Sequence, residues 1–163
     1  MVRTFCAANI NLTSPVKVVK TETEVKALGY KDEFIRALNE RGIKYSDIDE
    51  NSVDIRYTGD NTNIIEITVI FDDDDERTVA LRCWSFGKVP QEDKRPALFE
   101  ACNRVNNDFR WAKFFINEDD EVVAAIDAVV EIGTVGEECI SLVGRLVRIY
   151  DNAYPVLMKA YWA

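Results

Sequence analysis

The most constraining feature of this sequence is a row of strand-like segments separated by very short turns. Val53, Ile55 and Tyr57 alternate with polar residues, which is typical of a half-buried strand. The segments from Ile64 to Phe71 and from Thr78 to Phe86 are also rich in residues that favour strands. Because a parallel connection needs about a dozen residues or more, segments joined by such short turns must run antiparallel. The sequence therefore predicts an antiparallel sheet.

Helical patterns flank these strands. Residues 31–41 begin with acidic residues, continue with an apolar stripe and end before Gly42, which predicts a helix. Residues 43–48 then form a short alternating segment. A second helix is expected to be capped by Asp93 and to hold Pro96 in its first turn, where no helical N–H is lost. Its apolar face has helical spacing and consists of Leu98, Ala101, Cys102 and Val105.

A second hairpin and a long helix complete the pattern. Strands are expected from Trp111 to Ile116 and from Val122 to Val129. Thr134 and Glu137 have the spacing of a capping box, which predicts the start of the last helix. Pro155 predicts a kink or a fresh short helix near the C-terminus. The order α-β-β-β-α-β-β-α, with an antiparallel sheet of about five strands, predicts an α+β fold.

The length of 163 residues suits a single domain. We expect one α+β domain over residues 30–163, preceded by an N-terminal extension at residues 1–29. The sequence contains neither GxGxxG nor GxxxxGK, and an antiparallel sheet lacks the switch point at which doubly wound folds hold phosphate. These observations exclude the common nucleotide-binding folds.

The charge balance restricts the partners. Lys and Arg total 20 against 29 Asp and Glu, so the net charge is −9 and phosphate backbones are repelled. The longest apolar run, from Val122 to Val130, is interrupted by Asp127 and is too short to cross a bilayer. The N-terminus lacks the apolar core of a signal peptide. We therefore expect a cytoplasmic protein that contacts neither nucleic acid nor membrane.

Residues for catalysis or metal binding are scarce. The sequence has no histidine, which removes the commonest general base and metal ligand. Cys6, Cys83, Cys102 and Cys139 lack metal-ligand spacing, and we expect reduced structural thiols. The acidic run from Asp72 to Glu76 is interpreted as a solvated turn, with a weak cation site as the alternative. We predict no catalytic residue, no cofactor and no metal.

Asp127 is the most unusual charged residue in an expected strand. It shares the strand phase of Val123 and Ala125, so its carboxylate needs a partner if this phase faces the core. Arg82 and Arg56 are the natural partners on neighbouring strands. We expect a buried ion pair of Asp127 with Arg82, with an edge-facing charge or a functional carboxylate as alternatives.

Several residues of the second helix and of the C-terminus are candidates for contacts with a partner or a second copy. Phe99 lies on a nominally polar face, where it is either a stray exposed residue or a dimer contact. Large aromatic residues dominate interface energies but more often cover a sheet. The candidates are Phe99, Val105, Asn106, Tyr161 and Trp162.

Over about residues 32 to 160 the sequence resembles the YbjN family, also described as bacterial sensory transduction regulators. The resemblance is carried by helix and hairpin signatures at residues 34–45, 89–95, 101–106, 110–114 and 151–158. Among them are Val89-Pro90-Gln91-Glu92-Asp93-Lys94-Arg95, Ala101-Cys102-Asn103-Arg104-Val105-Asn106 and Asp151-Asn152-Ala153-Tyr154-Pro155-Val156-Leu157-Met158.

This resemblance implies a fold like that of class I type III secretion chaperones. These are small, acidic, non-enzymatic proteins that usually pair as dimers through the middle helix. Their element order agrees with the order inferred above from the residues. The resemblance brings no catalytic residues to this chain.

We therefore expect a non-enzymatic interaction module that binds a protein segment as a homodimer, because strand edges and helix grooves are common peptide-binding sites. The alternative is a domain that senses a small ligand in a pocket between the sheet and the C-terminal helix, with Asp127 and Arg82 as polar groups. An enzyme that relies on carboxylates alone is a third and weaker alternative.

Overall fold

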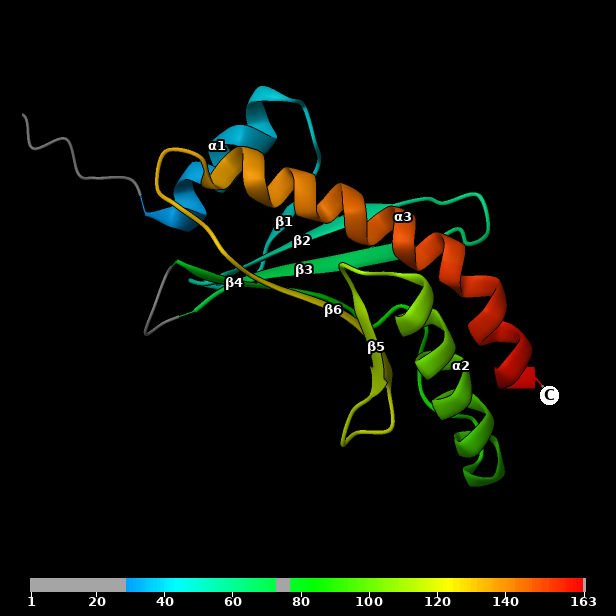
Figure 1. Cartoon of the computed structure of the whole chain (residues 1–163). Coiled ribbons are helices and arrows are strands. Elements are labelled where there is room, and N and C mark those ends of the chain that lie inside the picture. Colours follow the sequence, from blue (N-terminus) through cyan, green and yellow to red (C-terminus); the bar gives the residue numbers. More distant parts are fainter. Residues whose placement is uncertain (1–28, 73–76, 163) are drawn as a thin grey trace, which may run out of the picture.

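The computed structural model describes residues 29–72 and 77–162, which form three α-helices, one short 3-10 helix and a six-stranded sheet (Figure 1). The helices are α1 (Tyr30–Glu40), η1 (Glu92–Lys94), α2 (Arg95–Asp108) and α3 (Val135–Trp162). The strands are β1 (Ser46–Asp47), β2 (Ser52–Tyr57), β3 (Ile65–Phe71), β4 (Thr78–Cys83), β5 (Lys113–Ile116) and β6 (Val122–Val129). Apart from Gly29, the expected N-terminal extension lies outside the described residues.

The predicted α+β fold and its order of elements are confirmed. All neighbouring strands pair antiparallel, in the order β1-β2-β3-β4-β6-β5. The sheet has six strands rather than about five, because the alternating segment at residues 43–48 contributes the two-residue strand β1.

The sheet has one apolar face because its strands alternate in phase. In β3 every second side chain is buried, from Ile65 to Phe71. Ile67 lies opposite Ile55 of β2, and Val69 lies opposite Leu81 of β4, so apolar side chains line up across the strands. This inner face is the one that the helices cover.

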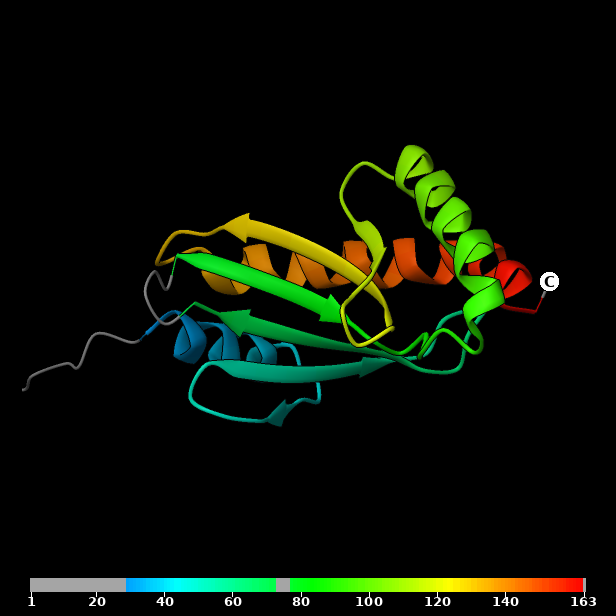
Figure 2. The same ribbon diagram turned by 90° about the horizontal axis from the view of Figure 1, so that it is seen from below.

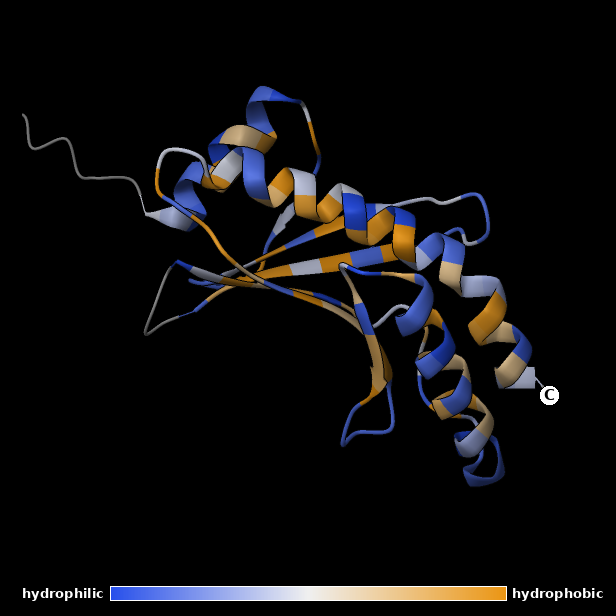
Figure 3. Cartoon of the chain, viewed as in Figure 1, coloured by the Kyte–Doolittle hydropathy of each residue, from blue (hydrophilic) through white to orange (hydrophobic). Residues whose placement is uncertain are grey.

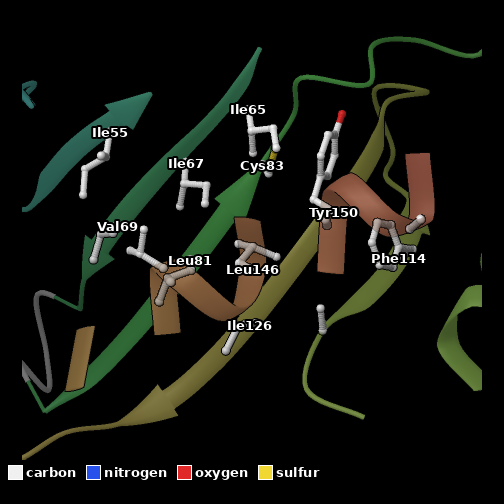
Figure 4. Packing of buried hydrophobic residues seen from close by; sticks show 14 of the residues in the cluster. Ile55, Ile65, Ile67, Val69, Leu81, Cys83, Phe114, Ile126, Leu146 and Tyr150 are labelled. Atoms are coloured by element: carbon white, nitrogen blue, oxygen red, sulfur yellow. The ribbon is translucent and has the colours of Figure 1, made fainter. Parts of the chain in front are cut away.

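The helices form a second layer on that face. Figures 1 and 2 show α1 and α3 along the inner face, with α2 beside the edge strand β5 and against α3. Leu146 and Tyr150 of α3 are at most 1% exposed and lie among inner-face side chains such as Leu81 and Ile126 (Figure 4). Side chains therefore fill the space between the sheet and α3.

Two strands are shorter than predicted. Strand β4 ends at Cys83, because the chain turns and brings Phe86 onto α3, with its ring 5.9 Å from that of Tyr154. Strand β5 begins at Lys113 and leaves Trp111 outside the sheet. In both places contacts with another element replace strand pairing.

Helix α3 is continuous from Val135 to Trp162 with Pro155 inside it, so the predicted fresh helix is wrong. The other predicted outcome, a kink, agrees with the bend that Figure 1 shows in the last, red part of α3. Proline removes one helical hydrogen bond, but Ala153 and Leu157 on either side of it are fully buried and hold the helix in place. Within the described residues, no helix has both the length and the apolar character needed to cross a bilayer.

The capping predictions are also wrong in detail. Asp93 lies inside η1, and α2 begins after Lys94 without a side-chain cap. The hydroxyl of Thr134 donates to the carboxylate of Glu138 at 2.7 Å, whereas Glu137 forms an ion pair with Arg41 at the end of α1. Contact with α1 thus takes Glu137 away from the capping box.

Asp151 fastens α3 to the loop between β2 and β3. Its buried carboxylate accepts hydrogen bonds from the backbone N–H groups of Asp60, Asn61 and Thr62 at 3.1, 2.9 and 3.2 Å. Burial raises the pKa of Asp151, but these hydrogen bonds outweigh burial and hold it below the ordinary value. A Cβ atom at Gly59 would collide with this carboxylate, which explains the glycine.

Candidate protein-binding surfaces

The predicted apolar face of α2 is its buried face. Leu98, Ala101, Cys102 and Val105 are all at most 7% exposed and pack into the core. Val105 is only 1% exposed, so its prediction as a partner contact is wrong: it belongs to the same stripe that holds α2 on the domain. Phe99 lies outside this stripe and is 50% exposed.

Asn106 has a structural role. Its side-chain amide donates to the carbonyl of Phe114 at 2.9 Å, and its carbonyl oxygen accepts from the Phe114 N–H at 2.7 Å. The amide therefore takes the place of a neighbouring strand along the outer edge of β5. An edge strand covered in this way is closed to strand addition at Phe114.

Two aromatic residues at the C-terminal end of α3 differ in their surroundings. Tyr161 is partly buried and packs edge-on against Phe86, with ring centroids 5.5 Å apart. Trp162 packs against Tyr161 at 5.1 Å but is 73% exposed. Of the two, Trp162 has the area to contact a partner.

The pair of Arg82 and Asp127 forms, at 2.6 Å, but the expectation that it is buried is wrong. The Asp127 side chain is 65% exposed, because its strand phase faces away from the helices. Arg56 pairs instead with Glu66, at 2.7 Å. Since Arg82 and Asp127 lie on the outer face and side chains fill the inner space, the expected ligand pocket between the sheet and α3 is wrong as well.

The cysteines behave as apolar core residues. Cys83, Cys102 and Cys139 are free and buried, whereas Cys6 lies outside the described residues. Burial raises the pKa of Cys102 to about 11 and that of Cys139 to about 12, which keeps both thiols protonated and unreactive at neutral pH.

Acidic residues and cysteines do not gather into a metal site in the part of the chain that the structure describes. Four residues of the acidic run, 73–76, lie outside that part. The turn between β5 and β6 is also acidic. Its Asp120 adopts a left-handed conformation (φ 65°) and forms an ion pair with Arg95. The carboxylate of Asp120 therefore has Arg95 as its partner within the fold.

The surface between α2 and α3 is hollowed along its length. One hollow, of about 480 Å³, lies between residues 97–104 of α2 and 155–160 of α3. A second, of about 250 Å³, lies between residues 108–111 and residues 145–152 of α3. The spacing of the lining residues places both hollows on one face of each helix. We call this surface the α2–α3 groove; its lining residues are Ala97, Glu100, Ala101, Arg104, Asp108, Phe109, Arg110, Trp111, Arg145, Arg148, Ile149, Asn152, Pro155, Val156, Lys159 and Ala160.

The α2–α3 groove is cationic in an acidic protein. It has five cationic side chains and two carboxylates, a local net charge of +3, whereas the whole chain has −9. Small and apolar side chains such as Ala101 and Val156 lie between the charges. The colouring of Figure 3 shows the same alternation of polar and apolar residues along α2 and α3.

Trp111 stands at one end of the groove. It is 54% exposed, and the guanidinium carbon of Arg145 lies 4.7 Å from its ring centroid. This cation–π contact holds Arg145 at the wall of the smaller hollow.

Sequence reasoning did not find this groove. Arg145, Arg148 and Lys159 have the spacing of one helical face, but that spacing alone is typical of a solvated surface. The groove exists because α2 lies against that face, and no sequence pattern predicts this packing.

The described residues form a small α+β domain with a six-stranded antiparallel sheet and a cationic groove between α2 and α3. The family model of YbjN, described as "Putative bacterial sensory transduction regulator", matches residues 31–158. The chain therefore belongs to the YbjN family, and the resemblance found in its sequence is confirmed.

A solved structure shares the fold. It is a chain of the heterodimeric ExoU–SpcU complex from the type III secretion system of Pseudomonas aeruginosa. The two chains are 15% identical, with a TM-score of 0.50, over 75% of this chain and 95% of that one. The expected likeness to the secretion-chaperone fold is therefore confirmed. No curated protein sequence matches the chain.

Proposed function

We propose that the protein is a non-enzymatic interaction module that binds a segment of another protein, as a homodimer in the cytoplasm. Membership of a family described as regulators and the fold shared with a secretion complex support this proposal. The fold alone does not determine the function, so the surfaces have to support it.

The observation that supports dimer formation best is the exposure of Phe99. Phe99 and Asn106 are seven residues apart and share one face of α2, the face toward β5 to which Asn106 is bound. Phe115 of β5 is also exposed, at 40%, on the strand face opposite the buried Phe114. A half-exposed phenylalanine on a rigid helix is a suitable centre for a self-complementary contact.

The test is sedimentation of purified protein over a range of concentrations. We expect a concentration-dependent dimer, and Phe99→Asp should weaken it at least about tenfold, because a carboxylate would be desolvated at the contact. Ile132→Asp is the matched control, since Ile132 is 52% exposed in a loop away from α2. A Phe99→Asp variant that stays as dimeric as wild type excludes α2 as the interface.

The partner is sought by native mass spectrometry of the chain purified from its own host. We expect the mass of two chains with a stoichiometric second polypeptide. A small constant excess of mass, with no polypeptide, would contradict a protein-binding role and indicate a bound ligand.

A further inference from the structure

Among the residues that the structure describes, the arginines of the α2–α3 groove lack the carboxylate partners that the other arginines have. Within residues 29–72 and 77–162 there are ten arginines, and six of them lie within 4.0 Å of a carboxylate oxygen. The four without such a partner line the groove: Arg104, Arg110, Arg145 and Arg148.

This distribution does not follow from a shortage of acids. The chain has nine more acidic than basic residues. Within the described residues every arginine outside the groove has a carboxylate partner, on the same helix, on another helix, on a neighbouring strand or in a loop. Arg145 and Arg148 are three residues apart on α3, a spacing at which like charges repel each other. Unpaired cations gathered on one surface of an acidic protein indicate a site for an anionic partner.

The chemistry of the groove favours carboxylates on a peptide. A guanidinium binds a carboxylate through two parallel hydrogen bonds, and the stacking on Trp111 already orients Arg145 for this. Glu100 and Asp108 in the lining, together with the net charge of −9, oppose a dense polyanion such as a nucleic acid. The small apolar residues between the charges suit the apolar side chains of a peptide.

We propose that the α2–α3 groove binds an acidic segment of a partner protein, whose carboxylates pair with Arg145 and Arg148. The inference deepens the proposed function, on which it rests for the partner being a protein. It does not depend on the dimer, because Phe99 lies on a different face of α2 from the groove residues Ala97, Ala101 and Arg104.

The test uses fluorescence anisotropy with the full chain and a short fluorescein-labelled peptide in which Glu residues alternate with Leu. The control peptide has Gln in place of each Glu. We expect the acidic peptide to bind and the control peptide not to bind. The double variant Arg145→Gln/Arg148→Gln should weaken binding at least about tenfold, since each guanidinium loses a charge-assisted hydrogen bond.

The matched control variant is Arg36→Gln/Arg56→Gln. It changes the net charge equally, but both of its arginines lie outside the groove and have carboxylate partners. Equal weakening in the two double variants would overturn the proposal, because it would show attraction to overall charge alone. Absence of binding to wild type, equal binding of the Gln peptide, or tighter binding of double-stranded DNA would overturn it too.

The results that would contradict the proposed function differ from those that would contradict the groove assignment. If Phe99→Asp and wild type are both monomers yet bind the acidic peptide, the dimer is wrong and the groove stands. If the native protein is a dimer with a second polypeptide but ignores the peptide, the proposed function stands and the groove assignment is wrong.

Discussion

The outer face of the sheet and the α2–α3 groove both expose arginines, but only the sheet neutralises them. On the sheet Arg56 pairs with Glu66 at 2.7 Å and Arg82 with Asp127 at 2.6 Å, across neighbouring strands. In the groove, Arg145 and Arg148 have no carboxylate oxygen within 4.0 Å among the described residues, although Asp108 lines the same hollow. Exposure alone therefore does not distinguish the groove from the sheet, whereas the lack of carboxylate partners among the described residues does.

Asp151 contrasts with the groove arginines, because its charge has partners within the fold: its carboxylate accepts hydrogen bonds from backbone amides. Replacing it with Asn puts an NH₂ group opposite amide donors, so we expect a loss of about 2–3 kcal/mol in the free energy of unfolding. Urea denaturation measures the loss. Asp127→Asn makes the same chemical change at an exposed site and should cost far less. Equal losses would show that Asp151 is no different from a surface carboxylate.

The same contact predicts a pH dependence. The pKa of Asp151 is lowered in the folded state, so its stabilising contribution is complete above the ordinary value of 3.8 and is lost as the pH falls through the folded pKa. The stability difference between wild type and Asp151→Asn should therefore shrink on acidification and stay constant near neutral pH. A difference that grows as the pH falls would contradict the assignment.

On the side of α2 that faces β5, the polar side chain of Asn106 has partners within the fold, unlike the arginines of the groove. Asn106→Ala leaves the N–H and carbonyl of Phe114 without their partner, and we expect a loss of about 1–2 kcal/mol. Because the edge of β5 is then open, self-association should also increase. Asn103→Ala on the exposed side of α2 is the control. Unchanged stability in a urea titration of Asn106→Ala would refute the structural role.

Much of the fold was predictable because it depends on local periodicity. The alternation in Val53–Tyr57, the short turns and the stripe of Leu98, Ala101, Cys102 and Val105 each reflect burial on one face. The predictions that were wrong concern contacts between residues that are far apart in the sequence. The alternation of residues in the strand places Asp127 on the same face as Val123 and Ala125, but it does not show which face the helices cover. At Pro155, the helix continues because Ala153 and Leu157 are buried against the core.

The site was less predictable than the fold for the same reason. Phe99 was found because an apolar residue on a polar face breaks a pattern. The sequence predicts Asn106 as a partner contact because its position is polar and outside the apolar stripe of α2. Its hydrogen bonds to Phe114 of β5 connect two separate elements, and no local pattern indicates them. The groove arginines follow an ordinary surface pattern. Among the described residues, only the lack of a carboxylate oxygen within 4.0 Å distinguishes them from Arg56.

The smallest expected effect sharpens the opening comparison most directly. Arg56→Gln removes an exposed ion pair and should lower the free energy of unfolding by about 0.5 kcal/mol or less. Arg148→Gln removes a cation next to Arg145 in the helix and should leave stability unchanged or raise it by about 0.2 kcal/mol. Replicate denaturation of both variants in low salt, where exposed charges are least screened, gives the order. If Arg148→Gln destabilises the domain more than Arg56→Gln does, Arg148 stabilises the fold and is not held free for a partner.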